Sequence, residues 1–172
     1  RERLGLSRRK VDPPQGLYIF GGVGRGKSML MDLFFLAAPV AKKRRVHFHA
    51  FMLEVHDSLH RRRQAGEADG DPIPPLAREI GDSAWLLCFD EFHVSNIADA
   101  MLLGRLFEAL FELGIVVVAT SNLAPDDLYA GGLQRDRFLP FIDLLKARMD
   151  ILGLDGAVDY RLKRLKDLSV YH

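Results

Sequence analysis

With 172 residues, of which 48% are hydrophobic, the chain can bury one sizeable core but is too short for two ordinary domains, so we expect one domain over 1–172. The 24 basic and 23 acidic residues leave a formal net charge of +1. The overall charge of the chain therefore gives no reason to expect a nucleic-acid or membrane-surface partner. The single cysteine, Cys88, excludes an internal disulfide framework and fits a reducing compartment such as the cytoplasm. The apolar stretches are shorter than the roughly 20 residues that a membrane span needs.

Strand-like apolar runs alternate with helical patterns along the chain. The runs cover residues 17–20, 46–49, 85–89, 115–119 and 150–154. This alternation is typical of βαβ units, in which helices cover a parallel sheet. The runs at 85–89 and 115–119 are nearly continuous in apolar residues, so we expect them at the centre of the sheet. We therefore predict an α/β fold, a three-layer α/β/α sandwich.

A glycine-rich loop directly follows the first apolar run. It reads Gly-Gly-Val-Gly-Arg-Gly-Lys-Ser over residues 21–28 and precedes an amphipathic run at 29–36. Glycines let the backbone curl so that its N–H groups and the N-terminus of the next helix bind phosphate oxygens. We weigh this against a glycine-rich turn without a ligand, and the flanking strand and helix favour the phosphate-binding P-loop.

The P-loop predicts a role for each of its polar side chains. Lys27 is expected to reach the β- and γ-phosphates of ATP, and the Ser28 hydroxyl is expected to bind Mg²⁺. The predicted nucleotide-binding residues are Gly21, Gly22, Val23, Gly24, Arg25, Gly26, Lys27, Ser28 and Met29.

The segment from 42 to 75 carries several weaker patterns. We interpret the basic clusters at 42–45 and 61–63 as solvated helix ends or loops, with an acidic partner or an anionic lipid surface as the alternative. His47 and His49 alternate on the run at 46–49 without a cysteine nearby, so we do not predict zinc there. Residues 64–75, rich in Gly, Ala, Asp and Pro, are predicted to form a surface loop.

Two carboxylates, Asp90 and Glu91, follow the buried run at 85–89. A carboxylate at the end of a central strand beside a P-loop can hold the Mg²⁺ shell, usually through water, and we assign this role to Asp90. Glu91 can point toward the γ-phosphate and polarise the attacking water. The alternative, that both residues cap a helix or solvate a strand end, loses weight because a P-loop lies upstream.

A helix and a polar strand end come next. The helix is predicted to begin after Asn96 as N-cap, with Asp99 three residues later, and to close at Gly114. A polar side chain just past the strand at 115–119 lies between the P-loop and the acidic pair, where an amide can orient the attacking water. Asn122 is the candidate, and an ordinary turn is the alternative.

Arg135 and Arg137 follow two glycines at 131–132. Arginine keeps its charge and presents a planar fork, which suits a phosphoryl group whose charge spreads in the transition state. If supplied in trans, one of the two would complete the site of a neighbouring subunit. The alternative is a surface arginine paired with Asp136 or Asp143.

Together these motifs and spacings resemble the AAA+ ATPases of the ZapE family, the bacterial cell-division ATPases related to mitochondrial AFG-like ATPases. The resemblance covers nearly the whole chain and is carried by GLYIFGGVGRGKSMLMDLFF, RRVHFHAFMLEVH, LLCFDEFHVSNIADAMLLGRLFEALFE, VVVATSNLAPDDLY and GLQRDRFLPFI. It implies an additional strand between the P-loop strand and the Asp90 strand. It also implies Walker A at 21–28, Walker B at Asp90 and Glu91, sensor 1 at Asn122 and an arginine-finger segment at 135–137.

The resemblance further implies a homo-oligomer that hydrolyses Mg-ATP and remodels a protein partner. In bacteria this would act on division-ring dynamics at the inner face of the membrane, and in mitochondria on protein quality control in the matrix. No nucleic-acid partner is expected.

AAA+ proteins normally carry a helical lid after the fifth strand. Only 18 residues follow Leu154, so we interpret 155–172 as the start of a truncated lid or tail. A short lid predicts weak ATP retention and slow turnover, which leaves open a regulatory module that holds nucleotide with little hydrolysis. Glu91 and Asn122 argue for hydrolysis. A GTPase is disfavoured because Asp90 is not followed by Asp-x-x-Gly, and small-molecule phosphotransfer remains an alternative.

Overall fold

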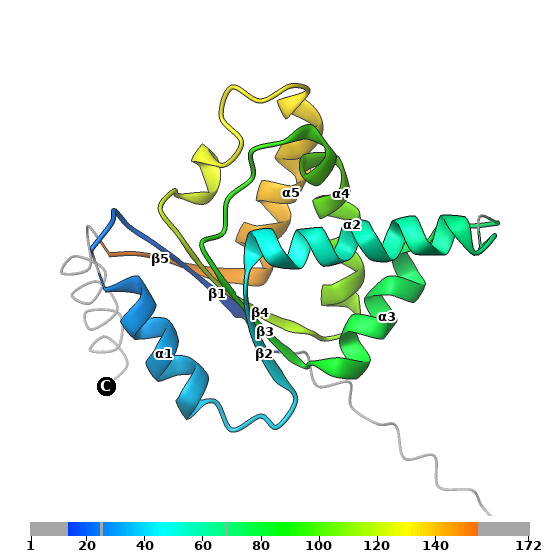
Figure 1. Cartoon of the computed structure of the whole chain (residues 1–172). Coiled ribbons are helices and arrows are strands. Elements are labelled where there is room, and N and C mark those ends of the chain that lie inside the picture. Colours follow the sequence, from blue (N-terminus) through cyan, green and yellow to red (C-terminus); the bar gives the residue numbers. More distant parts are fainter. Residues whose placement is uncertain (1–13, 25, 68, 155–172) are drawn as a thin grey trace, which may run out of the picture.

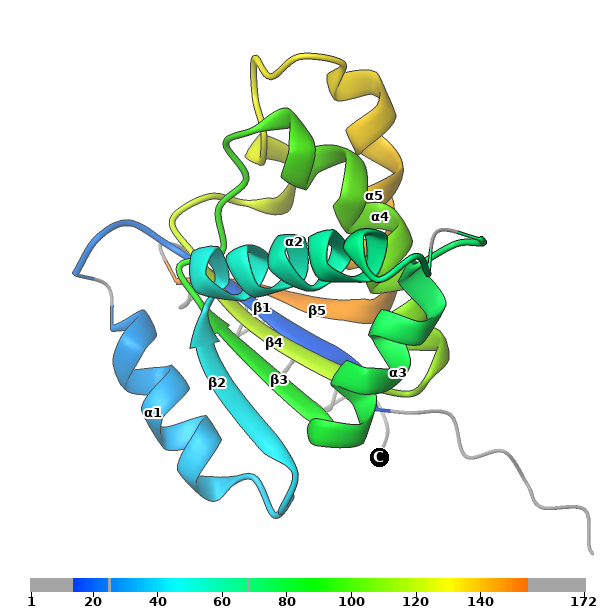
Figure 2. The same ribbon diagram turned by 45° about the vertical axis from the view of Figure 1, so that its right-hand side comes forward.

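The computed structural model describes residues 14–154 apart from 25 and 68, and these residues form a five-stranded parallel sheet in the order β2-β3-β4-β1-β5 (Figure 1, Figure 2). The strands are β1 (Gly16–Phe20), β2 (Lys43–His47), β3 (Leu86–Asp90), β4 (Val116–Ser121) and β5 (Met149–Gly153). All four neighbouring pairs run parallel. β4 therefore lies between β1 and β3, which confirms the predicted additional strand.

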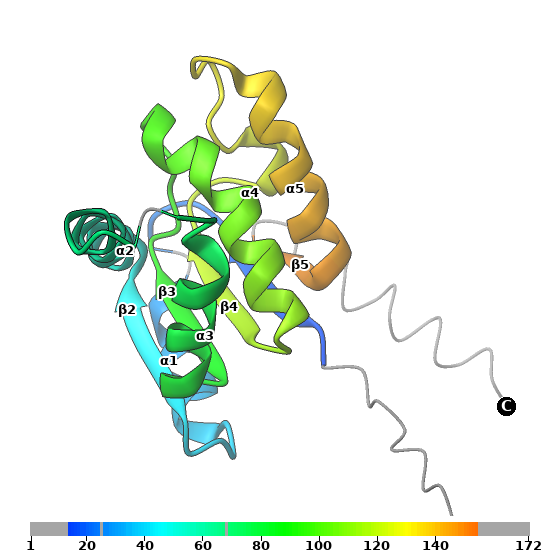
Figure 3. The same cartoon turned by 90° about the vertical axis from the view of Figure 1, so that its right-hand side faces the viewer.

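Helices cover both faces of the sheet, which confirms the three-layer α/β/α prediction (Figure 3). One face packs against α1 (Lys27–Ala37), the only helix on that side in the described part of the chain. The other face packs against four helices of the described residues, α2 (Phe48–Gln64), α3 (Ile73–Ser83), α4 (Ile97–Glu112) and α5 (Arg135–Arg148). A short 3₁₀ helix, η1 (Pro125–Asp127), connects β4 to the segment before α5.

Strand β3 shows why its sequence is apolar at every position. Successive side chains of a strand point to opposite faces, so Leu87 and Phe89 enter the core shared with α2 to α5, while Leu86 and Cys88 pack with Met31 of α1. A strand that is covered on both faces must be apolar throughout. Because β3 and β4 pair in parallel, their polar ends lie at the same edge of the sheet.

A cluster of buried phenylalanine rings packs in the core next to that edge of the sheet. Phe92, in the segment after β3, lies 6.1 Å from the ring of Phe107 on α4, and Phe107 lies 5.3 Å from Phe141 on α5. Phe89 at the end of β3 stacks 6.0 Å from Phe107. All four rings are at most 1% exposed. The segment that carries the acidic pair is thus anchored to two helices through its own aromatic side chain.

The predicted helix boundaries are largely confirmed. Asn96 caps α4, its side-chain oxygen accepting a hydrogen bond from the Asp99 amide at 2.9 Å. Gly114 follows the helix with a φ of +81°, a left-handed conformation that favours glycine.

Two boundaries predicted from the sequence are wrong. Residues 73–75 belong to α3 rather than to a loop. Proline is tolerated in the first turn of a helix because the backbone N–H groups there make no intrahelical hydrogen bond, so the lack of an N–H costs nothing. His49 lies in α2 and not on a strand, because β2 begins earlier, at Lys43, and α2 starts directly after His47. The basic residues of β2 are only half-buried at the sheet edge, so an apolar pattern could not locate that strand.

No helix in the range 14–154, leaving aside 25 and 68, is long and apolar enough to cross a membrane. The predicted start of a lid or tail at 155–172 lies outside the described residues.

Phe107→Ala should lower the free energy of unfolding by about 3–5 kcal/mol, because it removes a fully buried ring from the aromatic cluster and leaves a cavity. Urea unfolding followed by circular dichroism measures the change. Leu33→Ala, at a position 60% exposed on α1, is the control and should change stability by less than about 0.5 kcal/mol. Equal losses in the two variants would contradict the packing described here.

Candidate active site at the carboxyl edge of the sheet

The glycine-rich loop leaves β1 at the carboxyl edge of the sheet and leads into α1. The Gly21 amide donates to the Ser121 carbonyl at 3.2 Å, which ties the start of the loop to the end of β4. Gly24 and Gly26 have φ values of +78° and +81°, and a Cβ at either would meet nothing within 4 Å. Glycine is therefore required there by backbone conformation rather than by space. Arg25 lies outside the described residues.

Lys27 is folded back on this loop. Its ammonium group donates to the Gly21 carbonyl at 2.7 Å and to the Gly22 carbonyl at 2.8 Å. These two bonds hold the positive charge inside the curl of the loop, where it faces the adjoining cavity.

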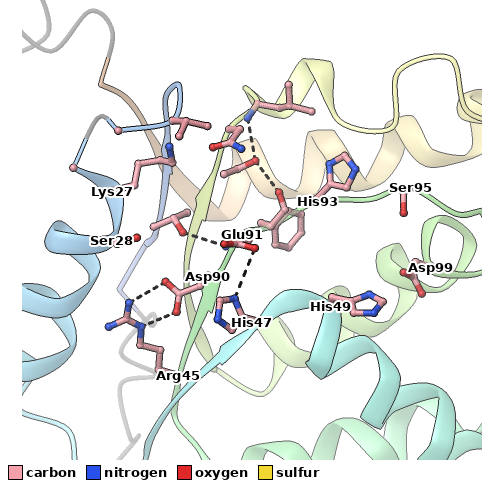
Figure 4. Close-up of a pocket in the computed structure, with 18 residues that line it drawn as sticks. Lys27, Ser28, Arg45, His47, His49, Asp90, Glu91, His93, Ser95 and Asp99 are labelled. Carbon is pink, nitrogen blue, oxygen red and sulfur yellow. Dashed lines mark hydrogen bonds and ion pairs between the residues drawn. The ribbon is translucent and has the colours of Figure 1, made fainter.

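One cavity of about 1040 Å³ opens at this edge. Among the residues predicted from the sequence, those that line it are Val23, Gly24, Gly26, Lys27, Ser28, Asp90, Glu91 and Asn122 (Figure 4). Gly21, Gly22 and Met29 do not line it, and the Met29 side chain is 66% exposed. The cavity is at the upper end of the usual size of small-molecule sites. Segments far apart in the sequence thus bring a phosphate-binding loop, two carboxylates and an amide to one space.

Asp90, the last residue of β3, is held by Arg45 of β2. The guanidinium Nε donates to Asp90 Oδ2 at 2.7 Å and Nη2 donates to Oδ1 at 3.0 Å. Arg45 also pairs with Asp32 of α1. These hydrogen bonds raise the pKa of Arg45 further above its ordinary value, so the guanidinium stays charged at every accessible pH.

The sequence reading missed Arg45. It stands inside the basic run at 42–45, which we interpreted as solvated, and only the register of β2 on β3 identifies its partner. In that register His47 lies beside Asp90 and Arg45 lies beside Cys88. A sequence signal would have been a basic residue two positions before the end of a strand that neighbours the Asp90 strand.

Glu91 occupies a left-handed backbone conformation with a φ of +54°. Such a conformation costs a residue other than glycine of order 1 kcal/mol or more, and it is found often at functional sites. The Glu91 amide donates to Thr120 Oγ1 at 3.3 Å, which compensates part of that cost. The carboxylate is 83% exposed, and His47 Nδ1 lies 3.9 Å from its Oε2. The sharp turn therefore sends the Glu91 carboxylate away from β3 and into the mouth of the cavity.

A short hydrogen-bond network joins the ends of β3 and β4. The Phe92 amide donates to the Thr120 carbonyl at 2.7 Å, and the Ser121 hydroxyl donates to the Phe92 carbonyl at 2.7 Å. The Leu123 amide donates to Ser121 Oγ at 3.1 Å. The buried Tyr18 hydroxyl donates to the Leu123 carbonyl at 2.7 Å. Loops bearing Glu91 and Asn122 are thereby fixed to each other.

Ser28 and Asp90 supply oxygen donors to the same cavity. A hydroxyl and a carboxylate are ligands of the kind that Mg²⁺ prefers, and magnesium usually keeps several waters as well. The donor set is therefore compatible with magnesium.

The two predicted arginine-finger residues lie outside the cavity lining and differ from each other. Arg135 donates through Nη2 to the carbonyls of Asp126 at 2.5 Å and Leu128 at 3.2 Å, so it braces the turn around η1. Arg137, on the first turn of α5, is exposed. Of the two, Arg137 has the more exposed side chain.

Comparison with known proteins places the chain among close relatives. The AFG1-like ATPase family model matches residues 2–172. The cell division protein ZapE of Escherichia coli K12 is 53% identical over 162 residues, which are 94% of this chain and 42% of that protein. Lactation elevated protein 1 homolog B of zebrafish, Danio rerio, is 51% identical over 164 residues, 91% of this chain and 33% of that protein. The chain thus spans less than half of either relative.

Domain III of the replication initiation protein DnaA of Thermotoga maritima has a similar fold, with a TM-score of 0.57. It is 17% identical, and the match covers 80% of this chain and 53% of that one.

Ser121→Ala should lower the free energy of unfolding by about 2 kcal/mol, because the buried Phe92 carbonyl and the Leu123 amide both lose a hydrogen-bond partner. Thermal and urea unfolding measure the loss. Ser83→Ala removes an exposed hydroxyl that donates to the Ile80 carbonyl and should cost no more than about 0.5 kcal/mol. A Ser121→Ala variant as stable as Ser83→Ala would show that the network contributes little.

Proposed function

Because the chain belongs to the AFG1-like ATPase family, we propose that its cavity binds ATP together with Mg²⁺ and hydrolyses the bond to the γ-phosphate. The observation that carries this proposal is the meeting of the P-loop with Asp90, Glu91 and Asn122 around one cavity. A phosphate-binding loop alone is compatible with a purely regulatory nucleotide. The addition of an exposed carboxylate and an amide at the same edge favours hydrolysis.

Binding would use the backbone amides of the loop, the N-terminus of α1 and the ammonium group of Lys27. The two hydrogen bonds from Lys27 to loop carbonyls already direct this charge inward. Phosphate oxygens are stronger acceptors than amide carbonyls because they carry negative charge, so the ammonium group would exchange the carbonyls for the triphosphate.

Ser28 and Asp90 would hold the metal. When bound, Mg²⁺ neutralises phosphate charge and polarises the phosphoryl oxygens. The carboxylate of Asp90 is only 13% exposed, so its charge is little screened by solvent.

Glu91 would act as the general base. A water molecule donates a proton to the Glu91 carboxylate while its oxygen forms a bond to the γ-phosphorus, and the bond from that phosphorus to the β–γ bridging oxygen breaks. ADP and inorganic phosphate are released. The Asn122 amide, at the cavity wall, would orient the water.

We further propose that the chain works as a homo-oligomer in which Arg137 of one copy completes the cavity of the next. Exposure of Arg137 supports this assignment, and the use of Arg135 in bracing its own chain argues against the other candidate. The name of the Escherichia coli relative, a cell division protein, supports a proposed role in cell division. We infer that this role consists of remodelling a protein partner in the cytoplasm.

Glu91→Gln should reduce the rate of ATP hydrolysis by about 10²- to 10⁴-fold and change ATP affinity by less than about 3-fold, because glutamine keeps the size of the side chain and loses the base. Phosphate release and calorimetric titration with Mg-ATP measure the two quantities. Glu112→Gln, which removes an exposed carboxylate at the end of α4, should leave both unchanged. If the unmodified chain releases phosphate no faster than Glu91→Gln, it holds nucleotide without turning it over.

Arg137→Ala should lower the turnover of associated chains by about 100-fold or more, because the transition state loses a cationic partner. Mixing Arg137→Ala chains with Lys27→Ala chains should restore part of the activity. The Lys27→Ala chains still carry Arg137, which they can supply to the intact cavities of the Arg137→Ala chains. Arg135→Ala should instead lower stability by about 1–3 kcal/mol by removing the donor to two carbonyls. Absence of rescue in the mixture would refute the contribution in trans.

A further inference from the structure

The guanidinium group of Arg45 lies against the carboxylate to which we assign the metal. Arg45 projects from β2 into the same cavity, and both of its hydrogen bonds to Asp90 are drawn in Figure 4. The contact is bidentate, with one donor on each carboxylate oxygen, at 2.7 Å and 3.0 Å. Such fork-to-fork pairs are stronger and more specific in geometry than contacts with a lysine. The orientation of the Asp90 carboxylate is therefore set by Arg45.

Arg45 also connects the elements of the site. Its Nη1 pairs with Asp32 on α1, the helix that begins at the P-loop. The exposed fractions are 60% for Asp32, 26% for Arg45 and 13% for Asp90. Water screens the outer pair, which contributes little, whereas the inner pair is largely shielded. The charge of Arg45 is thus felt mainly at Asp90.

A divalent cation that approaches Asp90 meets this charge. Each oxygen of Asp90 has lone pairs left to accept water from a metal shell, so the contact with Arg45 does not block the metal sterically. However, the guanidinium cancels the charge of the carboxylate and repels a second cation at short range. A triphosphate brings several negative charges and reverses this balance.

We propose that Arg45 is a positioning residue that orients Asp90 and prevents it from binding a free divalent cation, so that the metal enters only with the nucleotide. This inference rests on the proposed role of Asp90 in the ATP site. This role explains why the Arg45 guanidinium lies beside a proposed metal ligand, although its positive charge weakens metal binding there. The site would then avoid capture by abundant free magnesium in the absence of ATP.

The neighbouring Arg44 provides a matched control. It stands on the same strand, is 38% exposed, and makes its own ion pair with Glu54, in which Nη2 donates to both carboxylate oxygens at 2.6 Å and 2.8 Å. Arg44 does not line the cavity. Arg44→Gln therefore removes the same charge from the same strand without touching Asp90.

The test measures the binding of Mn²⁺ in the absence of nucleotide. Binding is detected as a decrease in the electron paramagnetic resonance signal of free Mn²⁺. Arg45→Gln should bind Mn²⁺ about 10-fold or more tightly than the unmodified chain, while Arg44→Gln stays within about 2-fold of it. Adding Asp90→Asn to Arg45→Gln should abolish the gain. Arg45→Lys, which keeps the positive charge, should stay within about 3-fold of the unmodified chain. Arg45→Met, which removes the charge but keeps an unbranched side chain, should reproduce the gain and serves if the glutamine variant is unfolded by circular dichroism.

Equal affinities in Arg45→Gln and Arg44→Gln, or no gain in Arg45→Met when that variant is the one that folds, would overturn the proposal and leave Arg45 as a structural ion pair. A gain that survives Asp90→Asn would overturn it as well, since the metal would then bind elsewhere. Calorimetric titration of the unmodified chain with Mg-ATP is run in parallel. Failure of that titration alone would count against the ATP site, and failure of the manganese series alone would count against the role of Arg45.

Discussion

The pairing of β3 with β4 is the constraint on which the candidate site depends. Both strands are buried on both faces and run parallel, so their last residues must emerge together at one edge. Because β4 also pairs with β1, the P-loop emerges at the same edge. Phe92 then secures the acidic segment from inside the core. The chemistry of the edge is thus positioned by apolar packing and strand register rather than by contacts among the polar groups alone.

Charge is distributed around this edge in opposed pairs. Lys27 faces carbonyl oxygens of its own loop, and Arg45 faces Asp90 and Asp32. Both cations are held by acceptors weaker than, or comparable to, the oxygens of a triphosphate. A polyanion with its metal would therefore rearrange existing interactions, and the affinity measured would be a difference between two bonded states. This fits a site that admits nucleotide and metal together.

The sequence allowed the fold to be predicted where burial leaves a periodic trace. The apolar runs of β3 and β4, the Asn96 cap and the P-loop are local signals, and they required no knowledge of tertiary contacts. β2 was misplaced because an edge strand of Lys43, Arg44 and Arg45 carries no apolar pattern. The ion pair of Arg45 with Asp90 joins residues 45 positions apart, so it depends on strand order and register. The roles assigned to the residues around the cavity stay predictions.

The arginines after β4 illustrate a second limit. Arg135 and Arg137 look equivalent in the sequence, since both flank an aspartate at the start of a helix. They lie two positions apart on the first turn of α5, and residues two apart on a helix point to nearly opposite sides, so Arg135 faces the η1 turn while Arg137 is exposed. The point at which α5 begins, which composition does not reveal, separates a bracing residue from an exposed one.

The left-handed backbone at Glu91 has a consequence for any mutational scan of this site. Asparagine, aspartate and glycine adopt such a conformation most readily, whereas β-branched side chains resist it. Loss of turnover after substitution by valine or isoleucine would mix a folding defect with a chemical one. Amides and short acids at the same position would report on proton transfer with much less distortion, so tolerance profiles there should be sorted by backbone preference before they are interpreted as chemistry.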